Sequence, residues 1–191
     1  MNALLFSTIS LSTIRLAVFL YLHAKYQNFS ILRNTVSDYG TGESRKLYNT
    51  MGILSLAAYS TLFVYLLSNP IAQQWLTIAL GIAILGSVAI LFFPTDRTGE
   101  KVTRTGRVHL AFAVLNFTAL FIFMTNVQLP SSTPQADFLN TATWIVRISF
   151  YAFLATLIIP KLRHKYIGLT ERLFLTATPI WFITFAWLLS A

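Results

Sequence analysis

Residues 74–93 read QWLTIALGIAILGSVAILFF, a run of twenty residues that contains no charged side chain. An α-helix of about 20 apolar residues is long enough to cross the roughly 30 Å hydrocarbon core of a bilayer. The run is continuously apolar rather than alternating at every second position, which favours a helix over a strand of a membrane barrel. Pro94 follows the run, where a residue that cannot continue a helix is expected. The segment therefore predicts a membrane-spanning helix.

Five further segments have the same character. The six predicted spans are roughly residues 2–22, 47–67, 74–93, 108–127, 141–159 and 173–190, with turn-forming breaks at 69–70 and 129–134. The 191-residue chain is 55% hydrophobic and only 10% charged, whereas soluble domains carry about 25% charged residues. This composition excludes a soluble enzyme and a disordered chain, and the lack of cysteine excludes a disulfide scaffold. We expect an all-α, polytopic bundle of six transmembrane helices that forms a single domain over residues 1–191.

The basic residues indicate how the chain is oriented. Apart from Arg15 and Arg147, all of them (12 of 14) lie in the first, third and fifth connecting segments. The positive-inside rule then predicts that these segments are cytoplasmic and that both termini lie outside. The net charge of +8 is mainly a consequence of this topology. Nucleic-acid binding is excluded, because three short loops provide no contiguous basic face with stacking aromatic residues.

Carboxylates and a histidine are expected on the same cytoplasmic face. Asp38 lies in the first connecting segment beside Ser37, Asp96 follows the third span, His109 begins the fourth span, and Glu171 precedes the sixth. Since odd-numbered connections share one side of the membrane, these groups lie at one depth. We predict that Asp38, Asp96 and His109 approach one another in a cavity open to the cytoplasm.

Each of these residues also has a structural interpretation. Asp38 belongs to a Ser-Asp-x-Gly turn, in which the aspartate bonds its own backbone. Asp96 can close a helix and cap a turn, and Glu171 in a first helical turn would favour the helix dipole. His109 can bond a loop carbonyl. The sequence leaves both kinds of role open.

The order and spacing of four motifs resemble a known bacterial family of multi-span membrane proteins, catalogued as domain of unknown function nine-nine-eight. The motifs are SDYG at 37–40, FPTD at 93–96, GRVH at 106–109 and GLTER at 168–172. The resemblance implies about six helices and singles out Asp38, Asp96 and His109, but it implies no activity. The chain departs from the family at Tyr39, where leucine is more usual, and in its short N-terminal helix.

Three polar residues are predicted within the membrane. An arginine at the centre of a spanning helix costs about 2.5–3.5 kcal/mol on insertion scales, so Arg15 and Arg147 should face a partner, a water-filled cavity or an interface. Arg147 is placed to extend outward toward Asp137. Asn116 in the fourth span is expected to serve helix packing.

The cytoplasmic cluster suggests a lipid-directed hydrolase. A divalent metal held by Asp38, Asp96 and His109 would activate water against a lipid ester or phosphoester. Alternatively, His109, oriented by Asp38 or Asp96, acts as a general base; activation of water is favoured over a covalent route in which Ser37 or Thr95 is the nucleophile. Thr95, Glu171 and Arg172 are the supporting residues on this face.

Other functions fit the same residues. One is a non-catalytic lipid-binding protein or an accessory subunit that binds a membrane-protein partner or a second copy. Another is a small transporter or proton relay that uses Arg15 and Arg147. A third is a single haem held by His23 and His109 at the inner face; a two-haem relay is excluded, because all three histidines lie toward that face.

Overall fold

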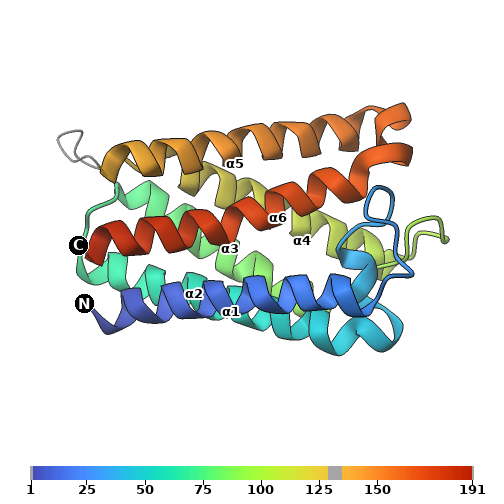
Figure 1. The fold of residues 1–191 in the computed structure, drawn as a ribbon, viewed down its shortest axis with the longest axis horizontal. Helices are drawn as coiled ribbons and strands as arrows, with labels where there is room; N and C mark the ends of the chain where they lie inside the picture. Colours follow the sequence, from blue (N-terminus) through green and yellow to red (C-terminus); the bar gives the residue numbers. More distant parts are fainter. Residues whose placement is uncertain (1, 129–134, 191) are drawn as a thin grey trace.

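The computed structural model describes residues 2–128 and 135–190, so the turn predicted at 129–134 lies outside the described residues. The six long helices of the described residues lie side by side as a bundle (Figure 1). They are α1 Ala3–Lys25, α2 Arg45–Ser68, α3 Gln74–Phe92, α4 Arg104–Asn126, α5 Gln135–Ile158 and α6 Pro160–Ser190. Each helix is long and apolar enough to cross a membrane. The predicted all-α bundle of six transmembrane helices is confirmed.

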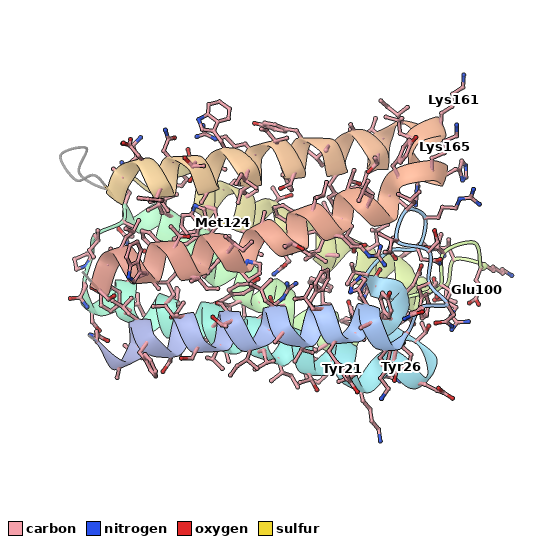
Figure 2. All side chains as sticks on the ribbon, in the orientation of Figure 1. Tyr21, Tyr26, Glu100, Met124, Lys161 and Lys165 are labelled. Atoms are coloured by element: carbon pink, nitrogen blue, oxygen red, sulfur yellow. The ribbon has the colours of Figure 1, made fainter. Side chains whose placement is uncertain are left out.

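The bundle has two chemically different ends. Both chain termini lie at one end, which we call the terminal end, on the left of Figure 1. At the opposite end lie segment 26–44, segment 93–103 and the junction of α5 with α6, and Figure 2 shows Lys161, Lys165 and Glu100 there. We call this the basic end. The positive-inside rule predicts that it faces the cytoplasm.

Large apolar side chains occupy two environments. Residues such as Leu85, Phe92 and Ile158 are exposed on the outside of the helices, as expected for a surface that faces lipid. The main buried cluster fills the half of the bundle nearest the terminal end, where Phe123 of α4 packs against Trp181 and Phe185 of α6. The indole N–H of Trp181 donates to Oγ1 of Thr143 at 2.9 Å.

Helix α6 differs from the prediction. Residues 160–172 were expected to form a connecting segment, but the 31-residue α6 begins at Pro160, directly after α5 ends. Proline ends one helix yet suits the first position of the next, because its missing N–H has no partner there and its φ is already helical. At 1.5 Å per residue α6 is about 46 Å long, which exceeds the hydrocarbon thickness of about 30 Å.

Segment 26–44 folds back over the basic end. It contains two short 3-10 turns, η1 Ser37–Gly40 and η2 Gly42–Ser44. The backbone N–H of Gly168 in α6 donates to the Leu32 carbonyl at 3.0 Å. A side chain at Gly168 would collide with the carbonyl of Asn34, so glycine is required for this close approach. The segment is thereby held against the first half of α6.

Candidate functional site

A cavity of about 660 Å³ occupies the half of the bundle nearest the basic end. Its polar wall comes mainly from α1, α2 and α6 and includes Arg15, Tyr48, Ser55, Tyr59 and Glu171. Its wall from α3, α4 and α5 is mainly apolar and includes Ile90, Leu91, Ala113, Val114, Phe117, Phe153 and Leu157, together with the polar side chains of Ser87, His109 and Asn116. Binding cavities for small molecules measure about 300–1,000 Å³, so this one can accommodate an organic ligand.

Arg15 lies deep in this cavity. It is the thirteenth residue of α1, about 18 Å along the helix from Ala3, and only 4% of it is exposed. Its Nη1 donates to the carbonyl of Leu175 in α6 at 2.6 Å, and its guanidinium lies 5.1 Å from the centre of the Phe19 ring. Its Nε is buried without a hydrogen-bond partner among the described residues. One of the two intramembrane arginines therefore belongs to the cavity.

A proline explains the contact between Arg15 and α6. In a regular helix the carbonyl of Leu175 would accept a hydrogen bond from the residue four positions later, but that residue is Pro179, which has no N–H. Arg15 supplies the missing donor through Nη1. The contact uses only part of the guanidinium, because arginine has five N–H donors.

Asp38 does not line the cavity. Its buried carboxylate accepts hydrogen bonds at Oδ2 from Asn34 Nδ2 at 2.9 Å and from the Thr35 N–H at 3.0 Å. Oδ1 accepts from the N–H of Thr98 at 2.8 Å and from its hydroxyl at 3.1 Å. Four donors thus surround the carboxylate, which joins segment 26–44 to segment 93–103. Asp38 therefore has a structural role, and this role joins two connecting segments rather than closing a local turn.

Asp96 lines the cavity and also organises the start of α4. Its Oδ2 accepts from the Thr103 N–H at 2.7 Å and its Oδ1 accepts from the Thr103 hydroxyl at 2.8 Å. The same hydroxyl oxygen accepts from the N–H of Gly106 as the N-cap of α4. A side chain at Gly106 would collide with the Asp96 carboxylate. Thr95, which also lines the cavity, donates to the Asp96 carbonyl at 3.1 Å.

His109 lines the cavity as well. Its Nδ1 lies 2.7 Å from the carbonyl oxygen of Phe93, so the predicted bond to a loop carbonyl is present. Because a carbonyl oxygen only accepts, Nδ1 must carry the proton, and Nε2 of the neutral ring keeps its lone pair. The imidazole therefore has a fixed orientation and a basic nitrogen available for chemistry.

The predicted three-residue metal site does not form. Among the described residues, no group of three His, Cys, Asp or Glu side chains is arranged to hold a metal ion. The reason is that Asp38 points into the two connecting segments, while Asp96 and His109 line the cavity. The predicted approach of all three within one cavity is therefore wrong for Asp38.

The histidine pair suggested for a haem is not available either. His23 has both ring nitrogens in hydrogen bonds: Nδ1 with the Phe19 carbonyl at 2.8 Å and Nε2 with Nε of Arg172 at 2.7 Å. An axial ligand needs a free ring nitrogen. His23 instead helps Arg172 to hold segment 26–44, since Nη1 of Arg172 donates to the carbonyls of Ile31 and Asn34.

Glu171 lies in the middle of α6, so its predicted place in a first helical turn is wrong. Its side chain is buried, lines the cavity, and accepts a short hydrogen bond from the N–H of Val36. Ser37, the next residue, also lines the cavity, and its hydroxyl lies 2.9 Å from that of Thr35. Glu171 and Ser37 therefore belong to the cavity. Arg172, the residue after Glu171, does not line it.

The remaining intramembrane residues have structural contacts. Nη2 of Arg147 donates to the Thr125 carbonyl at 2.9 Å, rather than pairing with Asp137, and the guanidinium lies over the Trp144 ring. Asn116 donates to the Ala83 carbonyl and, at 2.8 Å, to the Ser87 hydroxyl, so it joins α4 to α3 as predicted while also lining the cavity.

Sequence reasoning missed the polar wall of α2. Tyr48, Gly52, Ser55 and Tyr59 all line the cavity and recur at spacings of four, three and four residues. That spacing places them on one face of a helix, so the sequence of the second span was sufficient to predict this face. The basic rim, formed by Arg33, Arg97, Arg163 and His164, was recognised only as a topology signal.

Comparison with known proteins places the chain in a family. A family model described as a protein of unknown function (DUF998) matches residues 12–188, which is nearly the whole chain. No curated protein matches the chain. No solved structure matches it either.

Proposed function

The chain belongs to the DUF998 family, and from the form of its cavity we propose that the protein binds an amphiphilic membrane lipid. The observation that carries this proposal is the pairing of a polar wall with an apolar wall in one space of about 660 Å³. An amphiphile is the class of ligand that satisfies both walls, because its polar group and its chain each need a matching surface. The proposed membrane is the bacterial cytoplasmic membrane, with the cavity in its inner leaflet.

The rim of the cavity favours an anionic headgroup. Arg33, Arg97 and Arg163 are exposed side chains that line its mouth together with His164. Basic groups at a membrane surface attract anionic lipids by about 1 kcal/mol each. The mouth therefore concentrates acidic amphiphiles next to the cavity.

We place a lateral route between the cavity and the bilayer at the contact of α4 with α5. Of the consecutive helix pairs, α4 and α5 share the smallest packing interface. On the α4 side of this interface, Leu110 and Val114 line the cavity and are 47% and 45% exposed. An acyl chain can enter there without leaving an apolar environment.

A pair of tryptophan substitutions tests lipid binding. Ala113 lines the apolar wall, whereas Ala111 is exposed on the same helix and does not line the cavity. We expect Ala113→Trp to fill the cavity and reduce co-purifying lipid at least tenfold, while Ala111→Trp retains it. Native mass spectrometry of the full chain in a mild neutral detergent measures the bound lipid. Equal occupancy in both variants, or an unoccupied wild-type protein, would contradict the proposal.

The orientation of His109 supports a second candidate, hydrolysis of a lipid ester. Nε2 would take a proton from water as the water oxygen bonds to the acyl carbon, and the alcohol would leave with that proton. The supporting observation is the bond from Nδ1 to Phe93, which leaves Nε2 as an acceptor at the cavity. Release of fatty acid from vesicles containing labelled phospholipid, lost in His109→Gln with lipid binding retained, would support it. Binding without any release would reject hydrolysis and leave the binding proposal intact.

A further inference from the structure

We propose that Arg15 binds a carboxylate, so that the ligand is a long-chain carboxylic acid whose acidic group lies deep in the cavity. This inference rests on the proposed lipid-binding function and names the chemical group that is recognised.

The positive charge of Arg15 is not balanced by its hydrogen-bond partner. Arg15 lies about halfway along α1 and the residue is 96% buried, where an uncompensated charge is expensive. Its hydrogen bond among the described residues goes to an uncharged acceptor, the Leu175 carbonyl. Its Nε is buried without a partner, and the residue lines the cavity. A ligand that supplies an anion would satisfy both the charge and the free donor.

The geometry of the remaining N–H groups of Arg15 favours a carboxylate. Because Nη1 is used by Leu175, the donors that remain are the adjacent N–H groups of Nε, which is buried, and Nη2. Two adjacent donors of this kind match the two oxygens of a carboxylate in a bidentate pair. One guanidinium also matches the single charge of a carboxylate, whereas a phosphate monoester carries close to two negative charges.

The groups around Arg15 do not supply the anion. From α2, the cavity residues on this side are Tyr48, Ser55 and Tyr59, which carry hydroxyls. Two carboxylates, Glu171 and Asp96, line the cavity, but among the described residues neither pairs with Arg15: Glu171 accepts the N–H of Val36 and Asp96 accepts from Thr103. From α1 itself, the contact is the ring of Phe19. Hydroxyls beside a guanidinium are suitable donors for a carboxylate that enters between them.

The apolar wall identifies the rest of the ligand. It faces Arg15 from α3, α4 and α5 and reaches Leu110 and Val114 at the lateral opening. A single acyl chain would lie along this wall while the acidic group is held at Arg15. A long-chain carboxylic acid has this combination in one small molecule.

The test compares an acid with its matched alcohol. Equilibrium binding of oleate and of oleyl alcohol is measured on the full-length protein in neutral detergent, with oleyl phosphate as a third ligand. We expect the wild type to bind oleate at least tenfold more tightly than the alcohol. Arg15→Gln should lose at least tenfold in oleate affinity and less than twofold in alcohol affinity. Arg147→Gln removes the other intramembrane arginine, which lies outside the cavity, and should bind both ligands as the wild type does.

Pro179→Ala separates ligand binding from the structural contact. Alanine restores a backbone N–H for the Leu175 carbonyl, so Arg15→Gln combined with Pro179→Ala should recover the stability lost in Arg15→Gln. If Arg15 binds the carboxylate, the double variant stays deficient for oleate. If the double variant binds oleate like the wild type, Arg15 is purely structural and the inference is overturned.

The remaining outcomes distinguish the two proposals. Equal wild-type affinity for oleate and the alcohol would overturn the role of Arg15 but preserve lipid binding. Tighter binding of oleyl phosphate than of oleate would overturn the carboxylate assignment. Binding of none of the three ligands, together with no effect of Ala113→Trp on co-purifying lipid, would overturn the proposed function itself.

Discussion

The two halves of the bundle are built from the same six helices but are packed in opposite ways. Near the terminal end, large side chains such as Phe123, Trp181 and Phe182 are completely buried against one another. Near the basic end, the same helices surround a cavity of about 660 Å³. The helices are therefore packed together by large apolar side chains in one half and enclose a partly polar hollow in the other.

The two intramembrane arginines differ in the same way as the two halves of the bundle, one outside the cavity and one at it. Arg147 reaches the carbonyl of Thr125 at the end of α4 and covers the ring of Trp144, so its charge lies near an interface. Arg15 is enclosed at mid-height and lines the cavity. Similar residues in similar spans therefore have different roles, and the difference comes from what the surrounding helices leave open.

The largest expected effect concerns which leaflet contains the hollow half. Reporter fusions after Asn69, in the α2–α3 connection at the terminal end, should report the outside, because the connections at that end lack basic residues. Fusions after Gly99, in segment 93–103, should report the cytoplasm. The expected response is all-or-none at both positions. Opposite signals at both would place the cavity in the outer leaflet.

A leucine in each half measures the packing difference. Leu120 is buried in the filled half, so Leu120→Ala should lower the free energy of unfolding by about 2–5 kcal/mol. Leu91 already borders the cavity, so Leu91→Ala should lower the free energy of unfolding by less than about 1 kcal/mol, apart from the change in helix propensity. Reversible unfolding in mixed detergent micelles gives both values. Equal losses would show that the cavity wall is packed as tightly as the core.

The carboxylate at the basic end provides the smallest of the three effects. Asp38→Asn replaces one acceptor oxygen of a buried carboxylate that receives four hydrogen bonds, and it should cost about 1–3 kcal/mol. The amide of Thr98 should exchange hydrogen faster, because its acceptor is weakened. Asp137→Asn changes an exposed carboxylate at the other end and should stay within about 0.5 kcal/mol. If Thr98 exchange is unchanged in Asp38→Asn, the contact between segments 26–44 and 93–103 does not stabilise this end.

Most of the fold could be predicted because hydrophobic length determines a spanning helix almost independently of its neighbours. The exception was the start of α6. Residues 161–172 are rich in Lys and Arg and therefore lack the apolar signal, yet they are helical because Pro160 starts the helix and because Glu171 and Arg172 bond to segment 26–44. Contacts with a distant segment leave no periodic trace in the sequence.

The common membrane depth of the candidate site residues could be predicted from the sequence, but the direction in which each side chain points could not. Membrane topology predicted a common depth for Ser37, Asp96, His109 and Glu171, and all four line the cavity. It could not show that Asp38 turns away, because that depends on Thr98, sixty positions along the chain. Nor could it pair Arg15 with the carbonyl freed by Pro179, since this contact joins the first helix to the last.

The hydrogen bonds of the basic end also have a consequence for the order of biogenesis. The helices pack most extensively as consecutive hairpins, α1 with α2, α3 with α4, and α5 with α6. Arg172 of the last hairpin bonds to the carbonyl of Asn34, which precedes it by 138 residues. At about 5–20 residues per second, a ribosome makes Arg172 at least roughly 7 s after Asn34. Segment 26–44 therefore lacks these hydrogen bonds until Arg172 of α6 has been synthesised, and the basic end acquires its finished form only after that point.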